Sequence, residues 1–456
     1  MKIFVGLFVL GCLLLASTNA SASVAEPLDF DSALARALEV DQRIKEREHY
    51  VKAAQALRDE AQGSDDLIVS LNSFVGLTTQ VDGGLYGEEG EGCTGSCVPR
   101  SDNTDIDGLT PWFNLQVGVI KPLYTFGKVE SYEQAAKGNI ALKQGDVAIQ
   151  RGQTMLEVSK AYYGYLAARD TRKLLEDVDR RLRGAVELIE TWLEEGSAEV
   201  KQSDLYALEA GLSLVEGYHA QAGSLERVAE AGLRMLVQWP ENEPLILQDR
   251  RIRPLPMPDS DLAELQQQAL QQRPEMAQVE AGLKARKALV SAKQAEGKPN
   301  IYAGIVAGIA YSPERDQLDN PHIYDPFNFE AATPVVGLQW DFSVGAQPAR
   351  VAQAQAELDA TLALAAFARQ GIPFQVEESY HQLHGYSDMV ASLEQSSRSA
   401  RRWMIASYAD FEAGVEQAEK IMTALQTYVL AHSQYLQTVY EYNMQVKKLA
   451  VASGEG

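Results

Sequence analysis

The sequence repeats itself, and this repeat constrains the fold more than any other feature of its 456 residues. A shift of 218 residues aligns the chain with itself without a gap over about 70 positions, from Tyr124 on Phe342 to Gly196 on Gly414. Upstream the shift becomes 232, so the first copy carries 232 − 218 = 14 extra residues before Tyr124. A repeated sequence folds into repeated structural units rather than into unrelated domains.

The repeat predicts four segments along the chain. They are a signal peptide at 1–22, a first structural repeat at 23–239, a proline-rich connector at 240–259 and a second structural repeat at 260–456. Each repeat has the same expected order of elements: a helix at about 31–62 or 260–296, two strands separated by a loop, a very long helix, a short turn and a further helix.

The distribution of proline predicts the longest helices. All 17 prolines lie outside 123–239 and 374–456, and helix interiors exclude proline because it lacks a backbone N–H. We expect long helices after Lys128 and after Ala346, the first of which would be on the order of 100 Å long at 1.5 Å per residue. Rods of this length pack as antiparallel hairpins in a coiled-coil cylinder. The predicted fold class is therefore mainly α with a small β part.

Four segments have the alternating pattern of strands, at about 67–78, 112–121, 300–311 and 335–342. One side of each segment is apolar and the other is small or polar, over the length of a transmembrane β-strand. An amphipathic sheet of a soluble protein is the alternative for any single segment. Four strands cannot close a barrel, so the chain would have to pool strands with copies of itself. Three copies give a twelve-stranded barrel, although two or four copies are formally allowed.

The N-terminus has the layout of a secretory signal peptide. Lys2 precedes an apolar run of about 14 residues and then small residues, with cleavage expected after Ala20 or Ala22. A membrane anchor is the alternative, but it needs roughly 20 apolar residues. A lipoprotein site at Cys12 would interrupt the apolar run. The formal net charge of −22 disfavours nucleic acid as a partner, because phosphate is bound by clustered Lys and Arg.

Cys93 and Cys97 are the cysteines that remain after the signal peptide. An exported chain meets an oxidising compartment, so we expect a local disulfide between them. A zinc site is the alternative, but neither Cys nor His supplies two further ligands nearby. No catalytic motif stands out, and the sequence predicts no enzyme, no cofactor and no metal site.

The order of these motifs resembles the TolC-like outer membrane factor family. The resemblance rests on the repeat, on the two strands that lead into 122–128 and an Ala- and Gln-rich helix, on the Arg273–Pro274 helix start, and on the turns at Gly196 and Gly414. It implies a homotrimer with a twelve-stranded barrel in outer membrane lipid and a long helical tunnel in the periplasm. The implied function is passive export of small molecules or proteins, driven by an inner-membrane pump through a periplasmic adaptor protein.

The resemblance also implies two kinds of site at the tips of the helical hairpins. Gly196, Glu199 and Gly414 are candidates for docking the adaptor. Family members commonly carry Asp residues just after the tip glycine, where they form an acidic constriction. The corresponding candidates in this sequence are Asp204, Glu416, Glu419, Lys420 and Thr423. Side chains one helical turn apart share a face, so Glu416 and Glu419 or Lys420 are expected to line a pore, the alternative being an ordinary solvated face.

A different class of function also has to be considered. A soluble periplasmic coiled-coil scaffold or pump adaptor would contain helical hairpins too, but it would normally join them to compact β-rich domains. Two hairpins and four strands of membrane length favour an outer membrane channel or exit duct, located in the cell outer membrane with a periplasmic helical extension.

Overall fold

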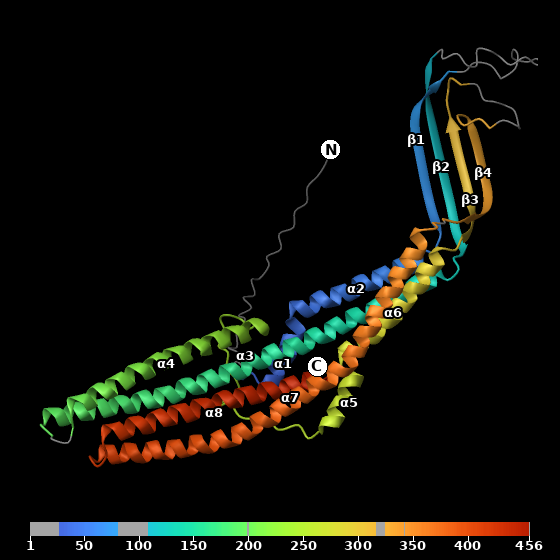
Figure 1. Cartoon of the computed structure of the whole chain (residues 1–456). Helices are drawn as coiled ribbons and strands as arrows, with labels where there is room; N and C mark the ends of the chain where they lie inside the picture. Colours follow the sequence, from blue (N-terminus) through green and yellow to red (C-terminus); the bar gives the residue numbers. More distant parts are fainter. Residues whose placement is uncertain (1–26, 81–107, 198–199, 316–323, 342, 456) are drawn as a thin grey trace, which may run out of the picture. The chain divides into compact units, whose positions relative to one another are not determined.

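The computed structural model describes residues 27–80, 108–197, 200–315, 324–341 and 343–455. These residues form eight helices and one four-stranded antiparallel sheet, which confirms the predicted fold class (Figure 1). The chain divides into two compact units: unit 1 comprises 1–41, 154–256 and 385–444, and unit 2 comprises 42–153, 257–384 and 445–456. No described helix is long and apolar enough to cross a membrane.

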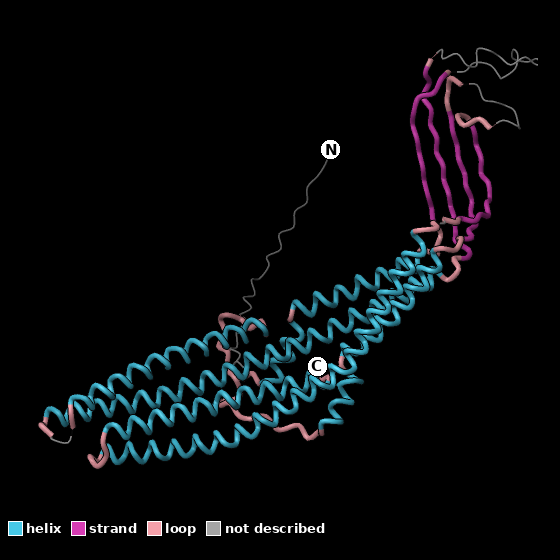
Figure 2. Tube along the Cα trace, in the orientation of Figure 1, coloured by secondary structure: helices cyan, strands magenta, loops and turns pink. Residues whose placement is uncertain are grey.

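Unit 2 contains the sheet. Its strands are β1 (Ile68–Thr79), β2 (Leu109–Tyr124), β3 (Asn300–Tyr311) and β4 (Phe329–Gln339), hydrogen-bonded in the order β1-β2-β3-β4 (Figure 2). The two strands of each repeat pair with each other, and β2 pairs with β3 across the repeats. β4 begins six residues before the expected position of 335, because Phe329 already pairs with Ala310.

Four helices of unit 2 form one layer. α2 (Gln42–Gly63) contacts α3 (Lys128–Glu194), α3 contacts α6 (Pro274–Glu296), and α6 contacts α7 (Ala346–Glu412). α5 (Leu262–Gln272) precedes α6, and the extended residue Arg273 separates the two helices, because Pro274 starts α6 as its first residue. The helix expected over 31–62 is likewise two helices, α1 (Phe30–Val40) and α2, since Asp41 adopts an extended conformation with ψ 115°.

Glycines at seven-residue spacing allow close packing along the unit 2 part of α3. A Cβ added to Gly138 would lie 2.6 Å from the Cβ of Ala285 on α6, and one added to Gly145 would meet the side chain of Gln278 at 2.3 Å. A Cβ on Gly152 would lie 3.2 Å from Val451 of α8 (Ala418–Ser453). Seven residues are close to two helical turns, so the three glycines share one face.

Unit 1 is built around the later parts of α3 and α7, α4 (Gln202–Leu236) and most of α8. Their shared core contains fully buried side chains from all four helices, including Leu182, Ile189, Leu208, Met404, Ile421 and Leu425. Figure 2 shows these helices as two neighbouring hairpins, α3–α4 and α7–α8. The apolar positions recur every three or four residues, which gives each helix one buried stripe.

The connector lies against the helices of unit 1 through its backbone. Asp170 of α3 accepts a hydrogen bond from the Ile252 N–H at 2.8 Å, and Asn443 of α8 accepts from Leu255 N–H and donates to the Arg253 carbonyl, both at 2.9 Å. Proline-rich segments cannot satisfy their backbone groups in a helix, so side chains of the neighbouring helices supply the partners instead.

Candidate functional site

The sheet exposes its apolar face, whereas a sheet in a soluble protein buries that face. Residues that pair directly across two strands point to the same side of the sheet. The register therefore places apolar residues of all four strands on one face. They are Val69, Leu71, Val75 and Leu77 of β1, Leu115, Val117 and Val119 of β2, Ile305 and Ile309 of β3, and Val336 and Leu338 of β4. This apolar face is open, with Val75 80% and Val336 78% exposed. The opposite face carries most of the small and polar residues, including Ser70, Asn72, Gln116, Gly118, Gly308 and Thr333, and a smaller number of large apolar ones such as Phe74 and Val306. An exposed apolar surface of this extent requires an apolar environment or a partner.

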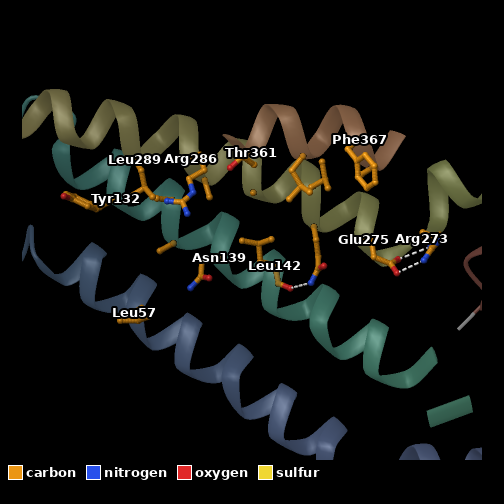
Figure 3. A pocket seen from close by; sticks show the side chains of 18 of the residues that line it. Leu57, Tyr132, Asn139, Leu142, Arg273, Glu275, Arg286, Leu289, Thr361 and Phe367 are labelled. Atoms are coloured by element: carbon orange, nitrogen blue, oxygen red, sulfur yellow. Dashed lines mark hydrogen bonds and ion pairs between the residues drawn. The ribbon is translucent and has the colours of Figure 1, made fainter. Parts of the chain in front are cut away.

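The sheet and the helix layer of unit 2 both have open margins. β1 and β4 each pair with a single neighbour among the described strands. α2 and α7 lie at the two ends of the described layer, and they expose Leu57 and Phe367 beside a groove of about 1090 Å³ (Figure 3). An edge strand with unpaired backbone groups is a template for pairing with another chain. The open margins therefore present two adjoining surfaces for further copies or partners.

The two hairpin tips have the same geometry. Gly196 has φ +73° and Gly414 has φ +72°, the left-handed conformation that favours glycine. The residue after each glycine donates its N–H to a carbonyl five residues earlier, Ser197 to Trp192 at 3.0 Å and Val415 to Asp410 at 2.9 Å. This is the Schellman motif, which ends a helix and turns the chain. Glu199 lies outside the described residues, as do Cys93 and Cys97.

Asp204 lies in the first turn of α4. Its carboxylate accepts a hydrogen bond from the Lys201 N–H at 2.9 Å, at the first turn of α4. The N-terminal N–H groups of a helix have no partner within the helix, and an acidic side chain there is also favoured by the helix dipole. The structure thus gives Asp204 a capping contact in addition to the role expected from the sequence.

Four candidates lie at the second tip, of which Glu416 and Lys420 form an ion pair and Glu419 and Thr423 do not belong to it. Lys420 forms an ion pair with Glu416 one turn earlier, and this contact lowers the pKa of Glu416 and raises the pKa of Lys420. Glu419 and Thr423 are exposed, and the Thr423 hydroxyl donates to the Glu419 carbonyl at 2.9 Å. The candidates of the second tip therefore contribute one compensated pair and one further carboxylate in each chain.

Contacts between aromatic side chains near the tips were not predicted from the sequence. Trp192 and Phe411 pack edge to face with ring centroids 5.3 Å apart, and so join the ends of α3 and α7. Farther along, the Arg181 guanidinium lies 5.4 Å from the ring of Tyr408, whose pKa is raised by burial and by the charge of Glu412. The only sequence signal was that large aromatic residues stand close to a helix end, which is too common to identify a contact.

No group of three His, Cys, Asp or Glu residues that could hold a metal ion occurs in the described ranges.

Comparisons with known proteins agree with this arrangement. Residues 265–455 match the family model of the outer membrane efflux protein. No curated protein sequence matches the chain. Among solved structures, the outer-membrane channel OprN is 17% identical with a TM-score of 0.75, covering 94% of this chain and 90% of OprN.

Two further channels have similar folds. The CmeC outer membrane channel of Campylobacter jejuni is 14% identical with a TM-score of 0.75, covering 94% of this chain and 86% of CmeC. The MtrE outer membrane channel of Neisseria gonorrhoeae, in its open state, is 15% identical with a TM-score of 0.71, covering 93% of this chain and 88% of MtrE. The outer membrane location expected from the sequence agrees with the family description. The resemblance to the TolC-like outer membrane factors is thus confirmed, since the chain has their fold over nearly its whole length and matches the outer membrane efflux protein family over residues 265–455.

Proposed function

We propose that the protein is the outer membrane exit duct of a tripartite efflux or type I secretion system. The observation that carries this proposal is the four-stranded sheet, whose open apolar face suits lipid and whose small and polar face suits a water-filled pore. Transport through such a duct is passive. An inner-membrane pump drives it, and a periplasmic adaptor joins the pump to the duct.

The working unit is a homotrimer. Four strands per chain are too few for a barrel, while three chains supply twelve. β1 of one chain would pair with β4 of the next, which removes both edges at once. The same arrangement brings α2 of one chain beside α7 of its neighbour and covers the exposed Leu57 and Phe367.

The hairpin tips are the proposed contact for the adaptor. Gly196 and Gly414 give the two tips the same turn, so six equivalent turns would form a ring in a trimer. Glu416, Lys420, Glu419, Thr423 and Asp204 follow these turns, and we assign them to the constriction of the entrance. Because Glu416 and Lys420 compensate each other, Glu419 is the candidate of the second tip whose charge this ion pair leaves uncompensated.

Fractionation distinguishes the duct from a soluble periplasmic scaffold or adaptor. The duct predicts a heat-labile trimer in detergent extracts of the outer membrane, with one β1–β4 contact per pair of chains. A chain that carries one introduced cysteine in β1 and one in β4 should form disulfide-linked dimers and trimers, while a chain with two introduced cysteines on the central strand β2 should not. A soluble monomer in the periplasmic fraction would exclude the duct.

A further inference from the structure

The small and polar face of the sheet is buried at one end. This end lies where β1 stops and β2 starts, away from the strand ends that join α2 and α3, and we call it the distal end. Thr110 is 0% exposed and Asn114 is 5% exposed, although both lie on the face opposite the open apolar one. Thr78 and Ala310, which pair with Thr110 and Asn114, are buried as well. The distal end is therefore covered on the side that the proposed function assigns to the pore.

Two described arms of the β3–β4 connection lie at this end, 312–315 and 324–328, and we call them the cover. Phe327 packs edge to face on Trp112 of β2, with centroids 5.4 Å apart. Asn328 ties the two arms together, because its side chain accepts from the Ser312 N–H at 2.8 Å and donates to the Arg315 carbonyl at 2.9 Å.

Arg315 fastens the cover to the first strand. Its Nη1 donates to the Thr79 carbonyl at 3.1 Å and to the Thr79 hydroxyl at 3.2 Å. The same guanidinium lies 4.3 Å from the centroid of the Phe327 ring. Arg315 thus connects the end of β1 with the ring that covers β2.

Three polar atoms of β2 are buried at the distal end without a hydrogen-bond partner among the described residues. They are Thr110 Oγ1, Trp112 Nε1 and Asn114 Oδ1, at every second residue and therefore on one side of the strand. Burying a polar group without a partner is unfavourable, and water would satisfy all three once the cover moved away. The contacts of Arg315 and Asn328 stabilise the cover in the observed position, while the burial of these three unpaired polar atoms destabilises that position.

We propose that the cover is a displaceable constriction at the exit of the pore, held in place by Arg315. The exit is narrow when Arg315 is seated on Thr79 and Phe327, and wide when the cover lifts and water reaches Thr110, Trp112 and Asn114. This inference rests on the proposed function, which makes the covered face the lining of the pore.

Polymer exclusion in planar bilayers tests the proposal on the full-length protein. Neutral polyethylene glycols of graded size are added to one side at a time, and the largest size that still lowers the conductance reports the width of that mouth. Arg315→Ala should raise the size limit from the distal side only and increase the fraction of time spent in the wide state by at least about tenfold, the effect of losing even one hydrogen bond from a charged group.

Three further variants make the test specific. Thr110→Val removes one unpaired hydroxyl with little change of shape and should lower the wide fraction, opposite to Arg315→Ala. Arg315→Lys keeps the positive charge but loses the guanidinium that contacts both Thr79 and the Phe327 ring, so its size limit should resemble that of Arg315→Ala. Arg369→Ala removes an equal charge from the exposed surface of α7 and should leave the distal limit unchanged.

The outcomes separate the two proposals. A wild-type protein that forms no conducting trimer would refute the duct, and the cover with it. Conducting trimers whose distal limit is the same in Arg315→Ala as in wild type would overturn the cover alone, and so would equal widening from both sides. Trimer content on unheated gels shows that each variant has assembled.

Discussion

Gly138 offers the sharpest test of the close packing between α3 and α6. A Cβ at this position would lie 2.6 Å from the Ala285 Cβ, 2.9 Å from the Ala281 carbonyl oxygen and 3.1 Å from the Ala285 Cα. Carbon atoms normally approach to about 3.5–4.0 Å, so the helices would have to separate by about 1 Å. Two of the three atoms belong to the backbone, which cannot rotate away.

Two opposing effects set the expected magnitude for Gly138→Ala. Overpacking costs about 1–3 kcal/mol, and replacing a helical glycine by alanine gains about 1 kcal/mol of helix propensity. The net effect is a loss of up to about 2 kcal/mol in the free energy of unfolding. Gly385→Ala in α7 is the matched control, because nothing lies within 4 Å of its added Cβ. This control should gain about 0.5–1 kcal/mol.

Thermal unfolding of the purified protein, followed by circular dichroism of the helices, measures both variants. A double-mutant cycle with Ala285→Gly adds a second readout, because removing the Ala285 Cβ relieves the shortest contact. The coupling between the two positions should be about 1 kcal/mol. If Gly138→Ala stabilised the protein as much as Gly385→Ala does, or if the coupling were zero, the close approach of α3 and α6 would be refuted.

Three further predictions concern unit 1. Alanine at Gly196 or Gly414 should lower the unfolding free energy by about 1–2 kcal/mol, because a left-handed residue with a Cβ is strained; an unchanged melting temperature would contradict the shared turn. Glu416→Gln should shift the reversal potential of the channel toward anions and Lys420→Ala should shift it toward cations, since each leaves one charge of the pair uncompensated; equal reversal potentials would remove the pair from the pore. Burial and then the charge of Arg401 lower the pKa of His432 below 6.5, so the stability contributed by its neutral form is present above pH 6.5 and is lost as the pH falls through the lowered pKa. His432→Gln should reduce this acid sensitivity in melts recorded between pH 7 and pH 5, and an identical pH profile would exclude His432 as its source.

Much of the fold could be predicted because its signals are local. The absence of proline predicts the long helix α3, although α7 continues through Pro373, and the tip glycines mark where both helices end. The alternation of apolar and small residues identifies the strands and their two faces, since the side-chain period of a strand is two. The repeat then places each element of the second copy opposite one of the first.

The candidate sites were harder to predict because they depend on which side chains meet. Sequence spacing put Glu416 and Lys420 on one face, but only the structure shows that they pair and leave Glu419 without this compensation. The sequence placed Asp204 after the tip glycine, but only the structure shows that its carboxylate also caps α4. The contact of Trp192 with Phe411 joins residues more than 200 positions apart, and no local pattern encodes such a contact.

Periodicity and backbone restrictions act within a few residues, so the amino-acid sequence alone indicates a duplicated, mainly helical chain with four strands of membrane length. Only the packed structure shows that α3 approaches α6 closely at Gly138 and Ala285, and that Thr110, Trp112 and Asn114 are buried with polar atoms that lack partners among the described residues. These properties arise from contacts between distant segments, whose geometry depends on the packing of the whole unit.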